Sequence, residues 1–329
     1  MDQAFIEDIF KIHDRKTFRA AALEVFYYQA KHTPVYRDYL AALGTDPSRI
    51  MEPEEIPFLP IEFFKSHTVL ADGKDAEVVF ESSGTTGTTP SRHLVADVSL
   101  YERSFSTGFQ LFYGNPGQYC ILALLPAYLE RQGSSLVHMM DHLIRQSGHP
   151  ESGFYLDNLS ALSEILQKRA TDKHPTLLLG ISFALLDLAE NYPQPLGSPI
   201  TVMETGGMKG RRNELIRSEL HQVLKEAFGV GNIHSEYGMT EMLSQAYSAG
   251  GGLFKTPPWM KVLIRDPNDP LSLLSSGQSG GINIIDLANI YSCSFIATGD
   301  LGKVHEDGGF EVLGRYDHSD IRGCNLLVS

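Results

Sequence analysis

The chain has few cysteines, and this scarcity excludes a disulfide framework. Its 329 residues include three, Cys120, Cys293 and Cys324, whose spacing fits neither a set of bridges nor a metal-ligand motif. The longest apolar run, residues 120–126, is far shorter than the roughly 20 residues that a membrane-spanning helix needs. The first residues carry acids and lack the apolar segment of a signal peptide. We therefore expect a cytoplasmic protein without a membrane span.

Basic residues are also scarce. Lys and Arg number 27 against 40 Asp and Glu, which gives a net charge of −13, and the dense basic cluster is confined to residues 209–212. Because nucleic-acid binding needs a basic footprint, we expect no nucleic-acid partner. The hydrophobic content of 42% is ordinary for a globular protein, and the length allows one large domain or two modest ones.

Short apolar runs alternate with amphipathic segments from residue 76 onward, which predicts an α/β domain with largely parallel strands. Residues 1 to about 45 have helical periodicity, and glycine-rich turns after residue 280 indicate a smaller β-rich part. The expected strands cover residues 77–80, 119–125, 176–180, 200–203, 232–234 and 281–285. The expected helices of the α/β part cover residues 98–113, 134–147, 159–170, 184–191 and 212–228.

The segment 80–93 is the strongest candidate for a phosphate-binding loop. Gly84 and Gly87 allow close approach of the backbone, and the hydroxyls of Ser83, Thr85 and Thr86 suit phosphate oxygens. It is not a Walker A loop, because no Gly-Lys-Ser/Thr follows at the required spacing. Taken alone, the run fits a flexible surface loop equally well.

A second candidate is the strand-to-helix segment 201–211, with Gly206 and Gly207 at its turn and Lys209 beside them. Ligands of open α/β sheets bind at the carboxyl ends of strands, and glycines let a flat ring or an acyl group lie against the backbone. Taken alone, this segment also fits a tight turn that leads into a helix.

A third candidate follows a short predicted strand. Tyr237 before Gly238 suits stacking on a base, Thr240 can reach a phosphate, and Glu241 is a hard oxygen ligand suited to Mg²⁺. Taken alone, the signal is weak, since Tyr-Gly turns are common.

Two further motifs carry Asp300 and Arg315 at predicted glycine-containing turns. An aspartate there can accept both ribose hydroxyls, and an arginine can bind hydroxyls or phosphate with two donors. Each motif alone fits a structural turn, in which Asp and Arg usually cap or pair.

The order of these five motifs resembles the adenylate-forming superfamily of acyl-CoA synthetases, adenylation domains of peptide synthetases, and luciferases. The resemblance extends over residues 76–323. Within the superfamily the chain is most similar to acyl-protein synthetases of the LuxE type, through segments 56–65, 124–131 and 321–324. Phenylacetate-CoA-ligase-like proteins, which share the Ser-Ser-Gly-Thr-Thr-Gly start, are the nearest alternative.

The resemblance implies an α/β fold, the large N-terminal-type adenylation domain, with mixed sheets flanked by helices and a helical N-terminal segment. It implies a helical segment at 1–75, an adenylation core at 76–313, and a hinge remnant with a cysteine-bearing tail at 314–329. The implied cofactor-binding residues are Ser83, Gly84, Thr85, Thr86 and Gly87 for ATP phosphates, Gly206 and Gly207 for adenine and the acyl group, Tyr237 with Gly238 for adenine, and Asp300 with Arg315 for ribose. Thr240 would contact the α-phosphate and Glu241 would bind Mg²⁺.

Two departures from the family pattern stand out. The phosphate loop lacks the usual Pro-Lys, for which Arg92 offers a substitute charge. Most members also continue into a C-terminal domain that carries a catalytic lysine, whereas the sequence here ends at Ser329. The resemblance then implies that adenylation uses a resident cation, with Lys209, Arg211 or Arg92 as candidates, or one from a partner.

The implied function is ATP- and Mg²⁺-dependent activation of a carboxylic acid, most similar to fatty-acid activation, followed by acyl transfer to the tail thiol of Cys324. An acyl-CoA-reductase-like or carrier protein is the expected partner. The apolar residues Gly180, Ile181, Phe183 and Met208 permit an alkyl substrate. Two alternatives stay open: a CoA or carrier-protein ligase for an aryl or short acid, and a non-catalytic nucleotide- or acyl-binding subunit.

Overall fold

The structure, a computed structural model, describes residues 1–82, 89–126, 133–156, 158–206 and 215–315. The strands are β1 (Leu59–Pro60), β2 (Val78–Glu81), β3 (Arg92–Val95), β4 (Cys120–Leu124), β5 (Gly153–Phe154), β6 (Thr176–Ile181), β7 (Ile200–Thr205), β8 (His234–Tyr237), β9 (Ala246–Ser248), β10 (Leu253–Phe254), β11 (Met260–Arg265), β12 (Ser279–Asp286), β13 (Phe295–Val304) and β14 (Phe310–Arg315). The α-helices are α1 (Gln3–Ile9), α2 (Arg15–His32), α3 (Pro34–Ala42), α4 (Phe63–Ser66), α5 (Val98–Tyr113), α6 (Ser135–Ser147), α7 (Leu159–Asp172), α8 (Ser182–Asn191) and α9 (Arg217–Phe228). Short 3₁₀ helices cover Pro47–Arg49, Pro53–Glu55 and Pro116–Gln118.

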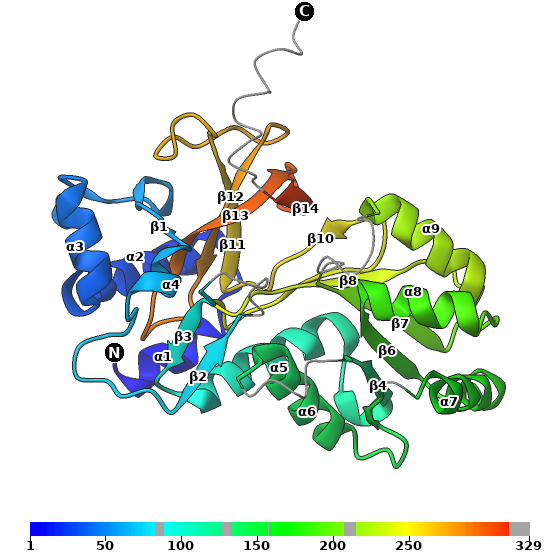
Figure 1. The fold of residues 1–329 in the computed structure, drawn as a ribbon. Coiled ribbons are helices and arrows are strands. Elements are labelled where there is room, and N and C mark those ends of the chain that lie inside the picture. The colour runs from blue at the N-terminus through cyan, green and yellow to red at the C-terminus, as the bar shows by residue number, and fades with distance from the viewer. Residues whose placement is uncertain (83–88, 127–132, 157, 207–214, 316–329) are drawn as a thin grey trace, which may run out of the picture.

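The first sheet has the strand order β5-β4-β6-β7-β8-β9, and its strands run parallel except β9. Helices α5 and α6 cover one face, and α7, α8 and α9 lie on the other (Figure 1). Strands β4 and β6 are buried along their whole length, as continuous apolar strands between two helical layers must be. The carboxyl ends of β7 and β8 therefore lie side by side, at the edge where α/β sheets bind ligands.

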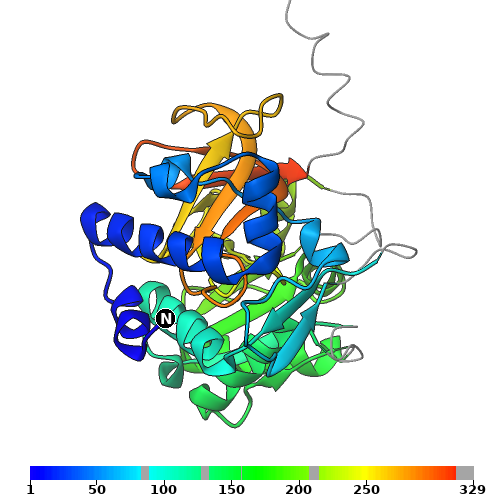
Figure 2. The ribbon, with the colours of Figure 1, turned by 90° about the vertical axis from the view of Figure 1, so that its left-hand side faces the viewer.

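The second sheet has the order β10-β14-β13-β12-β11 with antiparallel pairing, and β1 adds to β13 in parallel. Strands β2 and β3 form a separate antiparallel pair. Figure 2 shows the N-terminal helices in front of the second sheet. Phe26 of α2 and Tyr36 of α3 both pack on Phe295 of β13, with ring centroids 6.0 and 6.1 Å away.

Gln29 of α2 joins this helix to the segment between β12 and β13. The side chain is fully buried. Its Nε2 donates to the carbonyls of Asn289 and Ile290 at 2.9 and 2.8 Å, and its Oε1 accepts from the backbone N–H of Ser294 at 2.9 Å. One amide therefore satisfies three backbone groups that have no strand partner there.

The predicted parallel α/β region and helical N-terminal segment are confirmed. The strand expected at 232–234 is instead β8, His234–Tyr237, which places Tyr237 in a strand rather than a loop. Asp300 and Arg315 were expected at turns, but they lie opposite each other in β13 and β14. A bulge separates Leu301 from Gly302 in β13, and Gly302 serves the strand geometry, because a Cβ there would lie 2.6 Å from the Glu311 carbonyl oxygen.

Among the helices of the described ranges, none has the length and apolar character that crossing a membrane requires.

Replacing Gln29 by Leu is expected to lower the free energy of unfolding by about 2–4 kcal/mol, because several buried backbone groups would lose their partners. Urea unfolding measures this. Gln3→Leu, an exposed glutamine of α1, is the matched control and should change the free energy by less than about 0.5 kcal/mol. Equal effects of the two variants would contradict the anchoring role of Gln29.

Candidate nucleotide-binding site

The structure describes part of the site that the sequence predicts. Gly206, Tyr237, Gly238, Thr240, Glu241, Asp300 and Arg315 belong to the described residues. Ser83, Gly84, Thr85, Thr86, Gly87, Gly207, Met208, Lys209, Arg211 and Cys324 lie outside them.

Tyr237 and Asp300 meet where the two sheets face each other. The Tyr237 hydroxyl, at the end of β8, donates to Asp300 Oδ2 on β13 at 2.8 Å. Arg315 lies opposite Asp300 on β14, with its Nε 3.7 Å from Oδ1. Burial raises the pKa of Asp300, while the Tyr237 hydroxyl and the Arg315 charge lower it. Three residues from three motifs thus converge, and the carboxylate keeps acceptor sites for further hydroxyl donors.

Glu241 lies in the loop after β8, with only 5% of its surface exposed. Burial raises the pKa of its carboxyl, whereas a hydrogen bond with Ser91 and the charges of Arg315 and Lys65 lower it. Ser91 directly precedes β3, so Glu241 lies beside the segment that follows the predicted phosphate loop. A carboxylate next to the Thr240 hydroxyl is a donor set that suits Mg²⁺.

His93 and Asn289 hold the Thr240–Glu241 backbone. His93, fully buried on β3, has Nδ1 2.8 Å from the Thr240 carbonyl oxygen and Nε2 3.0 Å from Asn289 Oδ1. Asn289 Nδ2 donates to the carbonyls of Glu241 and Cys293 at 2.8 and 3.0 Å. Burial lowers the pKa of His93 to about 4, and a neutral ring carries one N–H, which donates to one of these two oxygens. Neither residue has a role in the sequence motifs, and the one signal in the sequence is the position of His93 just after the glycine-rich loop.

Asp286 fixes the next part of the same loop. The carboxylate is fully buried at the end of β12 and accepts from the backbone N–H groups of Leu243 and Ser244 at 2.7 and 3.0 Å. Burial raises its pKa, and these hydrogen bonds lower it. The loop that carries Glu241 is therefore held by three buried side chains from distant segments.

The opposite face of β8 carries a second buried acid, Glu236. Strand residues alternate between faces, so Glu236 points away from the side that Tyr237 occupies. The Thr205 hydroxyl donates to Glu236 Oε2 through a very short hydrogen bond. Burial raises the pKa of Glu236 to about 7. Gly238 permits this arrangement, since a Cβ there would lie 2.5 Å from Glu236 Oε1. Gly206, just after Thr205, has the positive φ of 68° that favours glycine.

Arg92, the candidate substitute for the lysine that the phosphate loop lacks, pairs with Glu81 on the neighbouring strand β2. Its Nε lies 3.6 Å from Glu81 Oε1, and the two residues are opposite in the β2–β3 register. Both side chains are about half exposed, so water screens the pair. Arg92 therefore stays available to an incoming phosphate.

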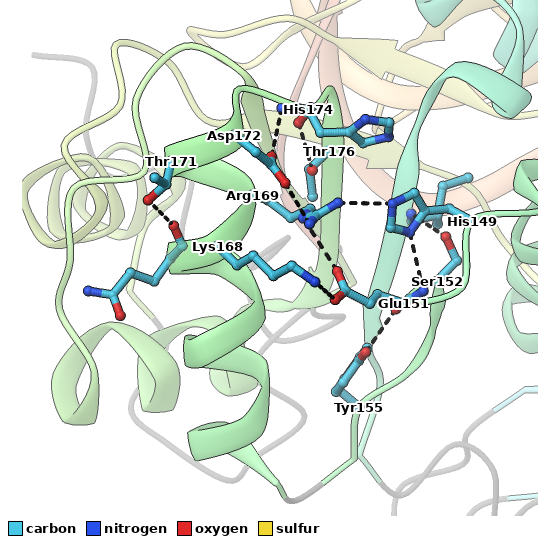
Figure 3. A network of polar contacts seen from close by, with 12 residues as sticks. His149, Glu151, Ser152, Tyr155, Lys168, Arg169, Thr171, Asp172, His174 and Thr176 are labelled. Carbon is cyan, nitrogen blue, oxygen red and sulfur yellow. Dashed lines mark hydrogen bonds and ion pairs between the residues drawn. The ribbon is translucent and has the colours of Figure 1, made fainter.

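A separate polar cluster surrounds Glu151, between β5 and α7 (Figure 3). Sulfur, nitrogen and oxygen atoms of Cys120, His149 and Glu151 lie within 4.8 Å of one another. His149 Nδ1 already accepts from the Glu151 backbone N–H at 3.2 Å, however, and Nε2 lies 3.0 Å from Arg169 Nη1. Arg169 also lies 3.3 Å from Glu151 Oε2 and supplies the positive charge. The cluster is an ion-pair network and not a metal site.

We expect Glu236→Gln to raise the free energy of unfolding, relative to the parent protein, by more at pH 8 than at pH 5. A carboxyl whose folded pKa is raised from 4.5 to about 7 favours the protonated form in the folded state. The protonated carboxyl of Glu236 therefore contributes about 3 kcal/mol to the free energy of unfolding below pH 4.5. This contribution is lost as the pH rises through about 7. Urea unfolding at both pH values measures the difference between variant and parent. The exposed Glu164→Gln should show no such pH-dependent difference.

No protein-family model matches the chain. Among curated proteins, the long-chain-fatty-acid–luciferin-component ligase of Vibrio harveyi is 23% identical over 327 residues, which cover 92% of this chain and 85% of that protein.

Solved acid ligases share the fold. An open conformation of 2-hydroxyisobutyryl-CoA ligase, bound to 2-HIB-AMP and CoA, has a TM-score of 0.64 at 16% identity, over 92% of this chain and 70% of that chain. ATP-bound MatB from Rhodopseudomonas palustris has a TM-score of 0.56 at 16% identity, over 86% of this chain and 58% of that chain. The chain thus spans less than two thirds of MatB. Together these findings bear out the resemblance at the level of fold and overall sequence: the chain shares its fold with these two proteins, and its sequence is similar to that of the Vibrio harveyi ligase.

Proposed function

We propose that this protein activates a carboxylic acid with ATP, forming an acyl-adenylate and releasing pyrophosphate. The convergence of Tyr237, Asp300 and Arg315 from three motifs carries the proposal. Buried Glu241, held beside the segment after the phosphate loop, adds to it. In this proposal residues 76–313 form the adenylation core, 1–75 pack on it, and 314–329 bear the acyl-accepting tail.

In the reaction a substrate carboxylate oxygen attacks the α-phosphorus of ATP. A carbon–oxygen–phosphorus anhydride forms, and the bond to pyrophosphate breaks. Because two anions must meet, catalysis depends on positioning and charge neutralisation. Asp300 accepts hydrogen bonds from the ribose hydroxyls, and the Tyr237 ring borders adenine. Thr240 contacts the α-phosphate, while Gly206 and Gly207 border adenine and the acyl group.

The phosphates and the metal lie toward the glycine-rich loop in this proposal. Ser83, Thr85 and Thr86 donate to the β- and γ-phosphates, and Gly84 and Gly87 let the backbone approach. Glu241 holds Mg²⁺, which supplies positive charge between the two anions when bound. Lys209 adds a cation near the α-phosphate.

The second step in the proposal is acyl transfer to Cys324. The thiolate attacks the acyl carbon, a carbon–sulfur bond forms, and AMP leaves. The other two cysteines suit this role poorly, because burial raises the pKa of Cys120 to about 11 and of Cys293 to about 12. The Vibrio harveyi relative acts on a long-chain fatty acid by its name, which favours a fatty acid here. In this proposal an acyl-CoA-reductase-like or carrier protein receives the acyl group.

Carboxylate-dependent ATP–pyrophosphate exchange tests the first step over fatty, aryl and amino acids. Glu241→Gln keeps the shape of the side chain and removes its charge, so exchange should fall by about 100-fold or more. Glu164→Gln, on the exposed face of α7, is the matched control and should keep full exchange. Undiminished exchange in Glu241→Gln would remove its metal-binding role. No exchange with any acid would favour a non-catalytic binding subunit instead.

Cys324→Ser is expected to keep pyrophosphate exchange and to lose the acyl label on the protein. The label is measured with radioactive acid and ATP, followed by release with neutral hydroxylamine, which cleaves thioesters. Cys293→Ala, which removes a buried thiol, should keep the label. A Cys324→Ser variant that still forms acyl-CoA at the parent rate would identify a CoA ligase and exclude acyl transfer through this cysteine.

A further inference from the structure

A row of polar side chains crosses three neighbouring strands at the carboxyl end of the first sheet. Thr205 on β7, Glu236 on β8 and Tyr247 on β9 are register partners, so their side chains point to the same face. Helix α5 covers this face, and its Tyr113 ring packs edge-on against Tyr247 with centroids 5.4 Å apart. Gln245 lies two residues before Tyr247 and approaches the same place, with its Cγ 3.3 Å from the Cβ position of Gly238.

Two atoms of this row lack a hydrogen-bond partner within the described residues. They are the hydroxyl of Tyr247 and the Oε1 of Gln245, and the two side chains are only 4% and 6% exposed. Tyr113, on the same face, differs because its hydroxyl pairs with His234 Nδ1 at 3.1 Å. Since buried polar groups are nearly always paired in native proteins, two neighbouring unpaired groups mark a place for a hydrogen-bonding ligand.

We propose that the row of Glu236, Gln245 and Tyr247 binds a hydrogen-bond-donating substituent, a hydroxyl or an amino group, on the carboxylic acid that the protein activates. This inference rests on the proposed adenylation activity and names the substrate class more closely. The proposed substrate differs from an acid with a purely alkyl chain. The apolar residues Ile181 and Phe183 would permit such a chain, but it would leave the polar groups of the row without hydrogen-bond partners.

The chemistry of the row selects a donor. Gln245 presents a carbonyl oxygen, Glu236 presents a carboxyl group that already accepts from Thr205, and Tyr247 can accept as well as donate. The location fits a substrate that spans β8. Tyr237 and Asp300 contact each other on one side of this strand, and Glu236 occupies the other side, so the substituent would lie across the strand from the nucleotide.

Pyrophosphate exchange with matched acids tests the proposal. Decanoic acid is compared with its hydroxy and amino derivatives, and benzoic acid with its hydroxy and amino derivatives. In at least one set, a substituted acid should have a KM about tenfold or more below that of the parent acid. Tyr247→Phe should abolish this preference and leave exchange with the unsubstituted acid unchanged. The better of the hydroxy and amino acids identifies the donor.

Tyr113→Phe is the matched control, because it removes a paired hydroxyl from the same aromatic cluster and should keep the preference. The urea midpoint gives a readout without substrate: Tyr247→Phe should leave it unchanged or raise it, whereas Tyr113→Phe should lower it. Unsubstituted acids that equal the substituted ones would overturn this inference and leave adenylation intact. A preference that survives in Tyr247→Phe, or a midpoint lowered as much as in Tyr113→Phe, would also overturn it. No exchange with any acid would overturn both proposals.

Discussion

The candidate site depends on the hydrogen bonds of the Asn289 side-chain amide. It lies between β12 and β13, yet it fixes the carbonyl of Glu241 beyond the end of the first sheet. His93 of β3 contacts the same amide, and Gln29 of α2 holds the segment around it. Three side chains and one backbone carbonyl, from four parts of the chain, thus belong to one buried network. The position of Glu241 follows from the register of the second sheet as much as from its own loop.

Burial acts differently on the two faces of β8. On the side of Tyr237, the carboxyls of Asp300 and Glu241 have raised pKa values, but each lies near cations or hydroxyls that favour its charge. On the other side, Glu236 has the Thr205 hydroxyl and no such cation among the causes of its shift. One strand therefore separates two acids whose charge is favoured by nearby cations or hydroxyls from an acid without a nearby cation.

The features that short stretches of sequence determine could be predicted from the sequence. The buried parallel strands appear as apolar runs, and helix α5 was placed at its observed bounds, because an amphipathic stripe and a following glycine define it. The motifs predicted site roles for Tyr237, Asp300 and Arg315, each beside a glycine, and for Glu241, three residues after one; these roles stay predictions. The residues that hold them were not found. His93 contacts Thr240 across 147 positions and Asn289 across 196, and no periodicity or spacing encodes such a contact.

The long separations also bear on how the chain folds. Gln29 and Asn289 are 260 positions apart, so helix α2 lacks its buried partners until nearly all of the described chain has been synthesised. Contacts between such distant segments pay a large loop-closure entropy before they stabilise anything, and they form slowly. The first sheet, built from strands close in sequence, can assemble earlier. The side of β8 that carries Tyr237 is thus completed late, after helix α2 has met the segment between β12 and β13.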